Sequence, residues 1–206
     1  MFLLNPFVFS QSVFALDPAK VKLLLHFDGN YNDSSPNNHT MTSGGNVSIS
    51  TSVPKFGSGK LQFGDTPTRD GFVKSPNIFD FGNKRPFTIS FFYRDGDGNG
   101  CFFTTRDSPT YTPIELSRGG YLIVGNATLS GWAIVAANMH INPIAYQHGA
   151  VVGDGTNIKV YRDGSLVATT PHPSWESASC LIQLGGGSPY SSEGGMDEFL
   201  LYDDVS

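Results

Sequence analysis

Paired carboxylates are the first chemistry to look for in this sequence, because glycosidic cleavage needs two Asp or Glu residues about 5 to 9.5 Å apart. Residues two apart on a strand share a face, so a strand-borne pair would show that spacing. No two of the four Glu residues have it; they are Glu115, Glu176, Glu193 and Glu198. Asp95 and Asp97 are two apart, but they stand in a Gly-rich stretch typical of a polar turn and not of a strand. Ser58, in Gly57-Ser58-Gly59, lacks the Gly-x-Ser-x-Gly elbow of a nucleophile. The sequence therefore predicts no catalytic residues.

Aromatic residues in polar loops indicate a different chemistry, the binding of a sugar. A pyranose has an apolar face that packs on an aromatic ring and a polar rim that needs hydrogen-bonding partners. Trp175, in the polar stretch His172–Glu176, fits this role best, and the alternative is that its ring packs against a sheet. Tyr111 and Tyr190 lie in turn-rich stretches and would extend the same ligand-binding rim.

The composition describes one compact domain that must position these residues. The chain has 206 residues, of which 39% are hydrophobic and 15% charged, with 24 Gly and 13 Pro. This length supports a full core without metal ions or disulfides. Cys101 and Cys180 are expected as buried thiols, with a single bridge as the alternative. The net charge of -5 and the scattered Lys and Arg argue against a nucleic-acid partner. No apolar stretch reaches about 18 residues, so no membrane span is expected.

Short runs of branched and aromatic residues, separated by Gly, Pro, Asn, Asp and Ser, predict β-strands throughout the chain. Phe87, Ile89 and Phe91 alternate with polar residues, as in a strand with one buried face. Asp163-Gly164 is typical of a two-residue hairpin turn. About a dozen such runs without helical spacers indicate an antiparallel β-sandwich or barrel. The expected strands are 23–27, 47–50, 61–63, 87–93, 101–105, 121–124, 132–136, 145–152, 158–162, 166–169, 180–184 and 198–202.

The first 15 residues are apolar and need a cover, since each large apolar side chain left in water costs about 1.5 to 3 kcal/mol. The side chains concerned are Phe2, Leu4, Phe7, Phe9 and Phe14. Asn5-Pro6 and Asp17-Pro18 favour extended backbone, so we expect residues 1–19 to form an arm that docks on another subunit. The alternatives are an additional strand of the same domain and a secretory leader cut after Ala15.

Six segments follow one another along the chain. They are Leu23–Gly29 (LLLHFDG), the polar loop 30–39, Lys55–Asp65 (KFGSGKLQFGD), Phe87–Arg94 (FTISFFYR), Tyr146–Thr170 with a Tyr-x-Asp-Gly turn, and Gly194–Ser206 with an Asp-Glu pair. In this order they resemble the concanavalin A-like, laminin-G-like jelly roll. The resemblance implies an all-β antiparallel β-sandwich over residues 20–206. Tyr146 departs from it, because a Trp is usual at that place.

The resemblance also implies a structural calcium ion, for which carboxylate oxygens are suitable ligands. The ligands here would be Asp28, Asp33 and Asp197, and the alternative is that Asp28 and Asp33 begin ordinary turns. A second candidate, Asp95–Gly100, matches the first half of a calcium-binding loop. It has Arg106 where such a loop has its bidentate Glu, so a polar turn is the better interpretation.

These observations together predict a binding or structural module without enzymatic activity. A chain with one such domain and an apolar N-terminal arm resembles the capsid-decoration and tail-fibre proteins of bacteriophages. That resemblance implies a virion component, anchored by its arm on virion subunits or on copies of itself, with outward loops that bind surface glycans. The alternative is a secreted lectin-type domain that binds carbohydrate, and a polysaccharide-cleaving enzyme of the same fold is less favoured.

Overall fold

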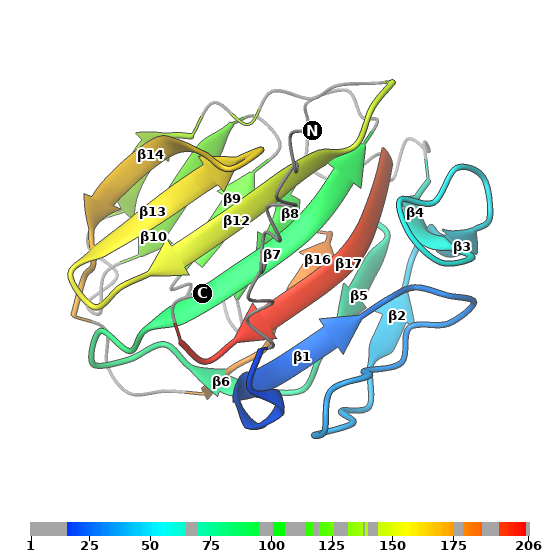
Figure 1. The fold of residues 1–206 in the computed structure, drawn as a ribbon, viewed down its shortest axis with the longest axis horizontal. Helices are drawn as coiled ribbons and strands as arrows, with labels where there is room; N and C mark the ends of the chain where they lie inside the picture. Colours follow the sequence, from blue (N-terminus) through cyan, green and yellow to red (C-terminus); the bar gives the residue numbers. More distant parts are fainter. Residues whose placement is uncertain are drawn as a thin grey trace, which may run out of the picture.

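The computed structural model describes residues 16–64, 70–94, 101–105, 114–117, 120–125, 132–137, 139, 144–174, 179–186 and 194–204. These residues form two large antiparallel sheets that pack face to face, as the sequence predicts (Figure 1). The predicted arm side chains lie outside the described residues; they are Phe2, Leu4, Phe7, Phe9 and Phe14. In the described part of the chain, no helix is long and apolar enough to cross a membrane.

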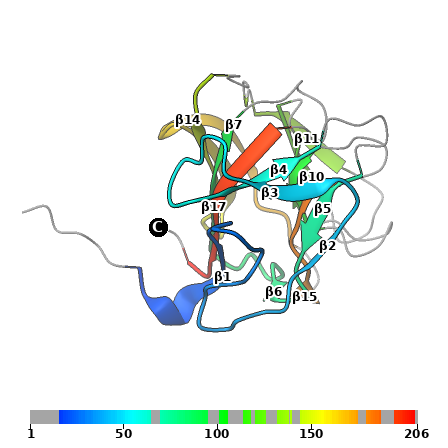
Figure 2. The ribbon, with the colours of Figure 1, turned by 90° about the vertical axis from the view of Figure 1, so that its right-hand side faces the viewer.

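The first sheet faces the viewer in Figure 1 and stands on the left in Figure 2. Its strands follow the order β14-β13-β12-β7-β17-β4-β3, and β1 pairs with the second half of β17. A short 3-10 helix, η1 (Pro18–Lys20), leads into β1. The strands are β1 (Val21–Leu25), β3 (Val47–Ser50), β4 (Lys60–Phe63), β7 (Phe87–Arg94), β12 (Gln147–Gly153), β13 (Asn157–Arg162), β14 (Ser165–Pro171) and β17 (Gly194–Tyr202).

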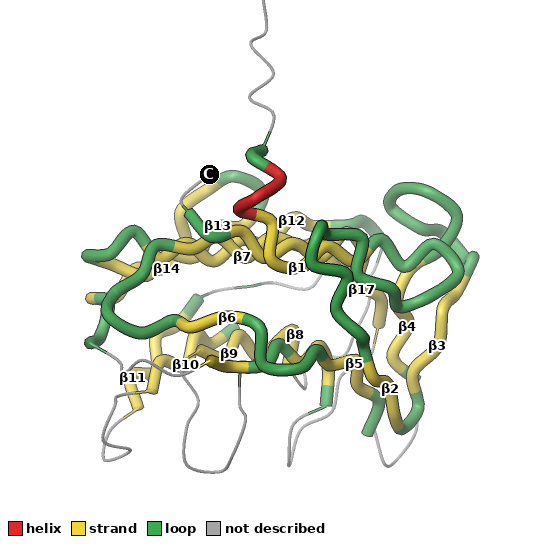
Figure 3. The backbone as a smooth tube through the Cα atoms, turned by 90° about the horizontal axis from the view of Figure 1, so that it is seen from below, coloured by secondary structure: helices red, strands yellow, loops and turns green. Residues whose placement is uncertain are grey.

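The second sheet lies beneath the first in the edge-on view of Figure 3 and follows the order β11-β10-β9-β8-β16-β5-β2. Its strands are β2 (Thr42–Gly44), β5 (Phe72–Lys74), β8 (Cys101–Thr104), β9 (Ile114–Ser117), β10 (Tyr121–Gly125), β11 (Trp132–Ala136) and β16 (Gln183–Gly185). Two further strands pair with each other; they are β6 (Phe79–Asp80) and β15 (Ser179–Cys180).

A phenylalanine-rich core fills the space between the two sheets. Phe87, Ile89 and Phe91 are fully buried, which confirms the predicted alternation in β7. The Phe91 ring centroid lies 5.3 Å from that of Phe102 in β8 and 6.2 Å from that of Phe199 in β17. Each such ring contributes about 1.5 to 3 kcal/mol through burial. Cys101 and Cys180, both within the described part of the chain, are buried thiols, as expected.

The hairpin turn predicted at Asp163-Gly164 joins β13 to β14. The φ angles are 49° for Asp163 and 77° for Gly164, the positive values that a two-residue hairpin turn of this type needs. The turn therefore fixes the register of these two strands, and this confirms the prediction from the sequence.

The single strand predicted over 180–184 was wrong, because the stretch divides between β15 and β16. Ser75 separates the two pieces: its N–H donates to the carbonyl of Ile182, and its hydroxyl accepts the N–H of Ile182, both at 2.9 Å. Four strands, β2, β5, β6 and β9, were not predicted. None exceeds 4 residues, which is too short for alternation to be visible in the sequence.

Candidate functional site

The structure tests only part of the predicted site. Trp175, Tyr111 and Tyr190 lie outside the described residues, as does the second calcium candidate, Asp95–Gly100. The three carboxylates proposed as calcium ligands are described, and each of them accepts hydrogen bonds from the protein itself.

Asp33 fixes the loop that follows β1. It is 3% exposed, and its Oδ1 accepts the backbone N–H groups of Leu24 at 3.0 Å and of Ser35 at 2.8 Å. Its Oδ2 accepts the Ser35 hydroxyl and the backbone N–H of His39, both at 2.9 Å. Both oxygens are thus used to hold the backbone of this loop in place.

Asp197 and Asp28 both hold the loop of residues 53–59, which joins β3 to β4. Asp197 is fully buried in β17, and its Oδ2 accepts the backbone N–H groups of Lys55 at 2.7 Å and of Phe56 at 3.1 Å. Burial raises the pKa of Asp197, while these hydrogen bonds act in the opposite direction. The buried carboxylate is therefore paired with two backbone donors of the loop.

Asp28, just after β1, holds the other half of the same loop. Its Oδ1 accepts the backbone N–H of Ser58 and, at 3.0 Å, that of Gly59. The bond from the Ser58 backbone is the largest of the causes that lower the pKa of Asp28. Two carboxylates far apart in the sequence therefore fix one loop through its N–H groups.

The predicted calcium ligands do not fit a shared calcium site. A calcium ion needs about six to eight oxygen ligands gathered around one point. In the chain as far as it is described, no group of three or more His, Cys, Asp or Glu side chains is placed to hold a metal ion. Asp28, Asp33 and Asp197 instead direct their oxygens at N–H and hydroxyl donors.

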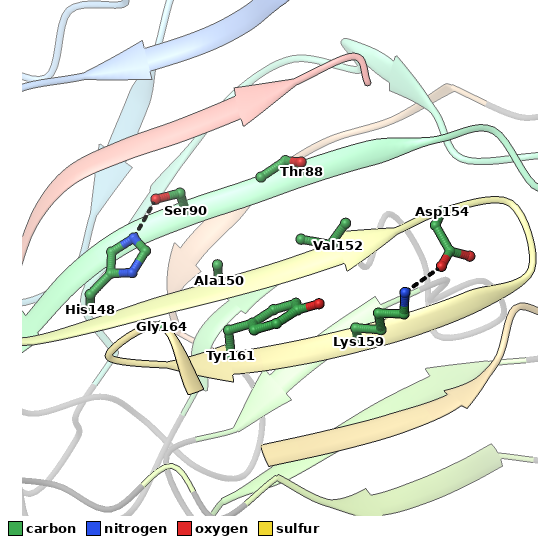
Figure 4. Close-up of a pocket in the computed structure, with 9 residues that line it drawn as sticks. All are labelled: Thr88, Ser90, His148, Ala150, Val152, Asp154, Lys159, Tyr161 and Gly164. Atoms are coloured by element: carbon green, nitrogen blue, oxygen red, sulfur yellow. Dashed lines mark hydrogen bonds and ion pairs between the residues drawn. The ribbon is translucent and has the colours of Figure 1, made fainter. Parts of the chain in front are cut away.

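A pocket of about 440 Å³ opens on the outer face of the first sheet, the face turned away from the core. Figure 4 shows the side chains that line it, which come from β7, β12, β13 and the turns beside them. They are Thr88, Ser90, His148, Ala150, Val152, Asp154, Lys159, Tyr161 and Gly164.

Small side chains on β12 form the floor of this pocket. Ala150 pairs with Ser90 in β7 on one side and with Tyr161 in β13 on the other, so these three side chains form one row across the sheet. In the next row across the sheet, Val152 stands between Thr88 of β7 and Lys159 of β13. Since neighbouring strands lie about 4.8 Å apart, the Tyr161 ring stands directly beside two short apolar side chains (Figure 4).

Polar groups close the two ends of the pocket. At one end the Ser90 hydroxyl lies 2.8 Å from Nε2 of His148. Burial lowers the pKa of His148, with Asp163 acting in the opposite direction, so the environment favours the neutral ring. At the other end Lys159 Nζ lies 2.7 Å from the Asp154 carboxylate. The hydrogen bond from Lys159 holds the pKa of Asp154 well below its usual range.

Sequence reasoning missed this pocket. It placed the ligand at loop aromatic residues, which are Trp175, Tyr111 and Tyr190. A sign was present in the central strands, where Thr88 and Ser90 alternate with core residues and His148 heads a second alternating strand. What the sequence does not show is that β7, β12 and β13 lie side by side, which brings Tyr161 to this row.

Several solved structures share this fold. Domain 4 of AbnA, a GH43 extracellular arabinanase from Geobacillus stearothermophilus solved in complex with arabinotriose, has a TM-score of 0.71 and 19% identity, with 90% of this chain and 93% of that chain covered. The binding domain of Paraclostridial Mosquitocidal Protein 1 has a TM-score of 0.65 and 14% identity, with 92% of this chain and 50% of that chain covered. The botulinum neurotoxin serotype D binding domain has a TM-score of 0.65 and 11% identity, with 91% of this chain and 49% of that chain covered.

At these identities the likeness shows the fold alone, and the chain spans about half the length of the two toxin binding domains. No curated protein sequence matches the chain. A family model does match the chain. Residues 65–206 fit the model of the concanavalin A-like lectin/glucanases superfamily. The matched segment runs from the end of β4 through the closing strand and includes every strand that lines the pocket. The chain therefore belongs to the concanavalin A-like lectin/glucanases superfamily.

Proposed function

We propose that this chain is a carbohydrate-binding module and that the outer-face pocket is its sugar site. The observation that carries the proposal is the row in which the Tyr161 ring stands beside Ala150, with Ser90 and His148 at one end. An aromatic ring and an apolar floor suit the apolar face of a pyranose, and the hydroxyl and imidazole groups suit its rim. A fold shared with a domain solved in complex with arabinotriose gives further support.

The same pocket supports a non-catalytic role. Hydrolysis of a glycosidic bond needs two carboxyl groups, an acid and a base or nucleophile. Of the described residues that line the pocket, Asp154 alone carries a carboxylate, and it is paired with Lys159. Glu198 lies elsewhere, with its Oε2 2.7 Å from Nδ1 of His26. We therefore expect binding of oligosaccharides without release of reducing sugar.

The test is binding of the full chain to a panel of neutral and acidic oligosaccharides, followed by calorimetry on the best ligand. Tyr161→Ala should weaken binding about tenfold, since it removes the ring that packs on the sugar. Tyr121→Ala is the matched control, because Tyr121 is 49% exposed on β10 of the other sheet. Binding that survives Tyr161→Ala, or an absence of binding to every sugar on the panel, would overturn the proposal.

We further propose that the module is a component of a virion. The apolar segment Met1–Ala15 would anchor the module on virion subunits or on copies of the chain, and its support is the apolar composition of that segment. Light scattering on the full chain and on a form that starts at Leu16 tests it. A defined assembly that dissociates without the segment supports the anchor, whereas a monomer in both forms contradicts it and favours a free lectin-type module.

A further inference from the structure

A second surface adjoins the pocket on the same outer face. Phe92 in β7 pairs with His148 in β12, and their ring centroids are 5.0 Å apart. Phe56, from the loop 53–59, meets Phe92 edge-on with centroids 5.3 Å apart. In Figure 2 this loop, in cyan, projects to the same side of the first sheet as η1. Aromatic surface therefore continues from the end of the pocket at His148 to the tip of the loop.

The loop is held rigidly in a conformation that leaves apolar side chains in solvent. Val53 has a φ of 52°, a strained value for a β-branched residue, and its carbonyl accepts the Tyr146 hydroxyl at 2.9 Å. Phe56 is 50% exposed and Val53 is 56% exposed. Asp197 holds the N–H of Phe56, so this ring stays beside Phe92. Strained backbone and exposed apolar surface that a fold maintains at such cost are characteristic of binding sites.

A positive charge lies over the same rings. Nζ of Lys55 is 5.5 Å from the ring centroid of Phe56 and 5.3 Å from that of Phe92, within the range of a cation–π contact. Lys55 is exposed, and it forms no salt bridge with any described residue. The nearby carboxylate of Asp197 is occupied with backbone N–H groups. The ammonium group is thus placed to meet an anionic group that arrives on the ring surface.

We infer that Lys55, Phe56 and Phe92 form a second subsite, the Lys55 platform, which takes the carboxylate-bearing unit of an acidic oligosaccharide while the neighbouring unit occupies the pocket. The apolar face of the acidic sugar packs on the Phe56 ring, and its carboxylate pairs with Lys55. This inference rests on the proposed function, since the pocket supplies the other contact. An anionic lipid surface would also carry the negative charge that pairs with Lys55. We favour a glycan because the platform is continuous with the sugar pocket.

The test is an array in which each acidic glycan is printed beside its neutral form. Uronate oligosaccharides are paired with their methyl esters, and sialylated glycans with their desialylated forms. The full chain should bind the acidic member of the preferred pair about fivefold more tightly, as an exposed ion pair allows. The preference should shrink between about 0.15 M and 1 M salt because the charges are then screened.

Variants separate the two subsites. Lys55→Gln should remove the preference for the acidic form. Phe56→Ala should weaken both about threefold to tenfold, since the ring contributes stacking to either form. Lys74→Gln is the matched control for charge, because Nζ of Lys74 lies 5.4 Å over the Phe72 ring on the other sheet. Ile134→Ala controls for the loss of an exposed apolar side chain, as Ile134 is 64% exposed on β11 of the other sheet.

The outcomes distinguish failure of the platform from failure of the pocket. Equal binding of acidic and neutral forms, or a preference that survives Lys55→Gln, overturns the platform and leaves the sugar pocket standing. A chain that binds no glycan overturns both. Phosphatidylserine-containing vesicles provide the last arm: vesicle binding that is lost in Phe56→Ala, without glycan binding, assigns the loop to a membrane surface and overturns the platform.

Discussion

Replacement of Asp197 by Ala should loosen the loop 53–59 and lower the stability of the whole domain. The substitution leaves the N–H groups of Lys55 and Phe56 without their acceptor, at a site where the carboxylate is fully buried. A hydrogen bond to a charged group contributes about 1.5 to 3 kcal/mol, and water that reaches the N–H groups of the exposed residues Lys55 and Phe56 offsets part of the loss. We expect a loss of about 2 to 4 kcal/mol. In a chain of this size that lowers Tm by about 4 to 16 °C.

Urea unfolding at neutral pH, followed by tryptophan fluorescence, measures this loss. Asp197→Asn is the informative companion, because it keeps a carbonyl oxygen for the loop donors and removes the charge. Burial raises the pKa of Asp197 above the ordinary aspartate value of 3.8. Its contribution to stability is therefore full below that value and is lost as pH rises through the higher pKa of the folded state. Asp197→Asn should therefore gain stability relative to the parent between pH 3 and 7.

Asp28→Ala is the control, since Asp28 accepts N–H groups of the same loop from an exposed position and should cost less. If Asp197→Ala is no more destabilising than Asp28→Ala, the buried carboxylate does not hold the loop as argued. If the free energy of unfolding of Asp197→Asn follows that of the parent at every pH, the pKa of the Asp197 carboxyl group is not raised.

Three further predictions concern the core, the pocket and the metal. Gly153→Ala should lower stability by about 1 to 3 kcal/mol in urea, because a Cβ there would lie 2.3 Å from the fully buried Phe87 ring; an unchanged midpoint would contradict the close packing. Burial lowers the pKa of His148, so its contribution to stability is full above the ordinary histidine value of 6.5 and is lost as pH falls through the lower pKa of the folded state. The parent should therefore lose more stability than His148→Gln between pH 7.5 and 5.5, and parallel curves would refute this. Calcium added after chelator treatment should leave Tm unchanged, whereas a rise that Asp28→Ala abolishes would restore a calcium site at that carboxylate.

The sequence predicts features that depend on neighbours along the chain. Alternation in β7 identifies Phe87, Ile89 and Phe91 as buried, and Asp163-Gly164 identifies a hairpin because positive φ angles suit those residue types. The pocket depends on which strands lie side by side, and alternation does not encode that order. Nothing local connects Ser90 to Tyr161, although both flank the same residue of β12.

The roles of the carboxylates also depend on residues that are distant in the sequence. The residue type indicates what a carboxylate can bind, but not which partner it meets. An Asp at the end of the first strand and another in the last strand are suitable calcium ligands by chemistry alone. Asp197, however, meets the N–H of Lys55, which is 142 residues away in the sequence. A carboxylate satisfies a cation or a set of N–H donors with the same lone pairs, so the identity of the partner follows from the path of the loop, which the residue type does not reveal.

A loop fixed by carboxylates gives the outer face a property that a mobile loop would lack. Ordering a rotamer-rich side chain at a binding surface costs about 0.5 to 1.5 kcal/mol, and a loop that is already ordered avoids that cost. Asp28, Asp197 and Tyr146 fix the backbone of the loop from three separate parts of the chain, and Phe56 is thereby held against Phe92 before any ligand arrives. Stability and binding are then coupled at one residue. Asp197→Ala should weaken the binding of a ligand to the Lys55 platform, even though the Asp197 side chain is buried.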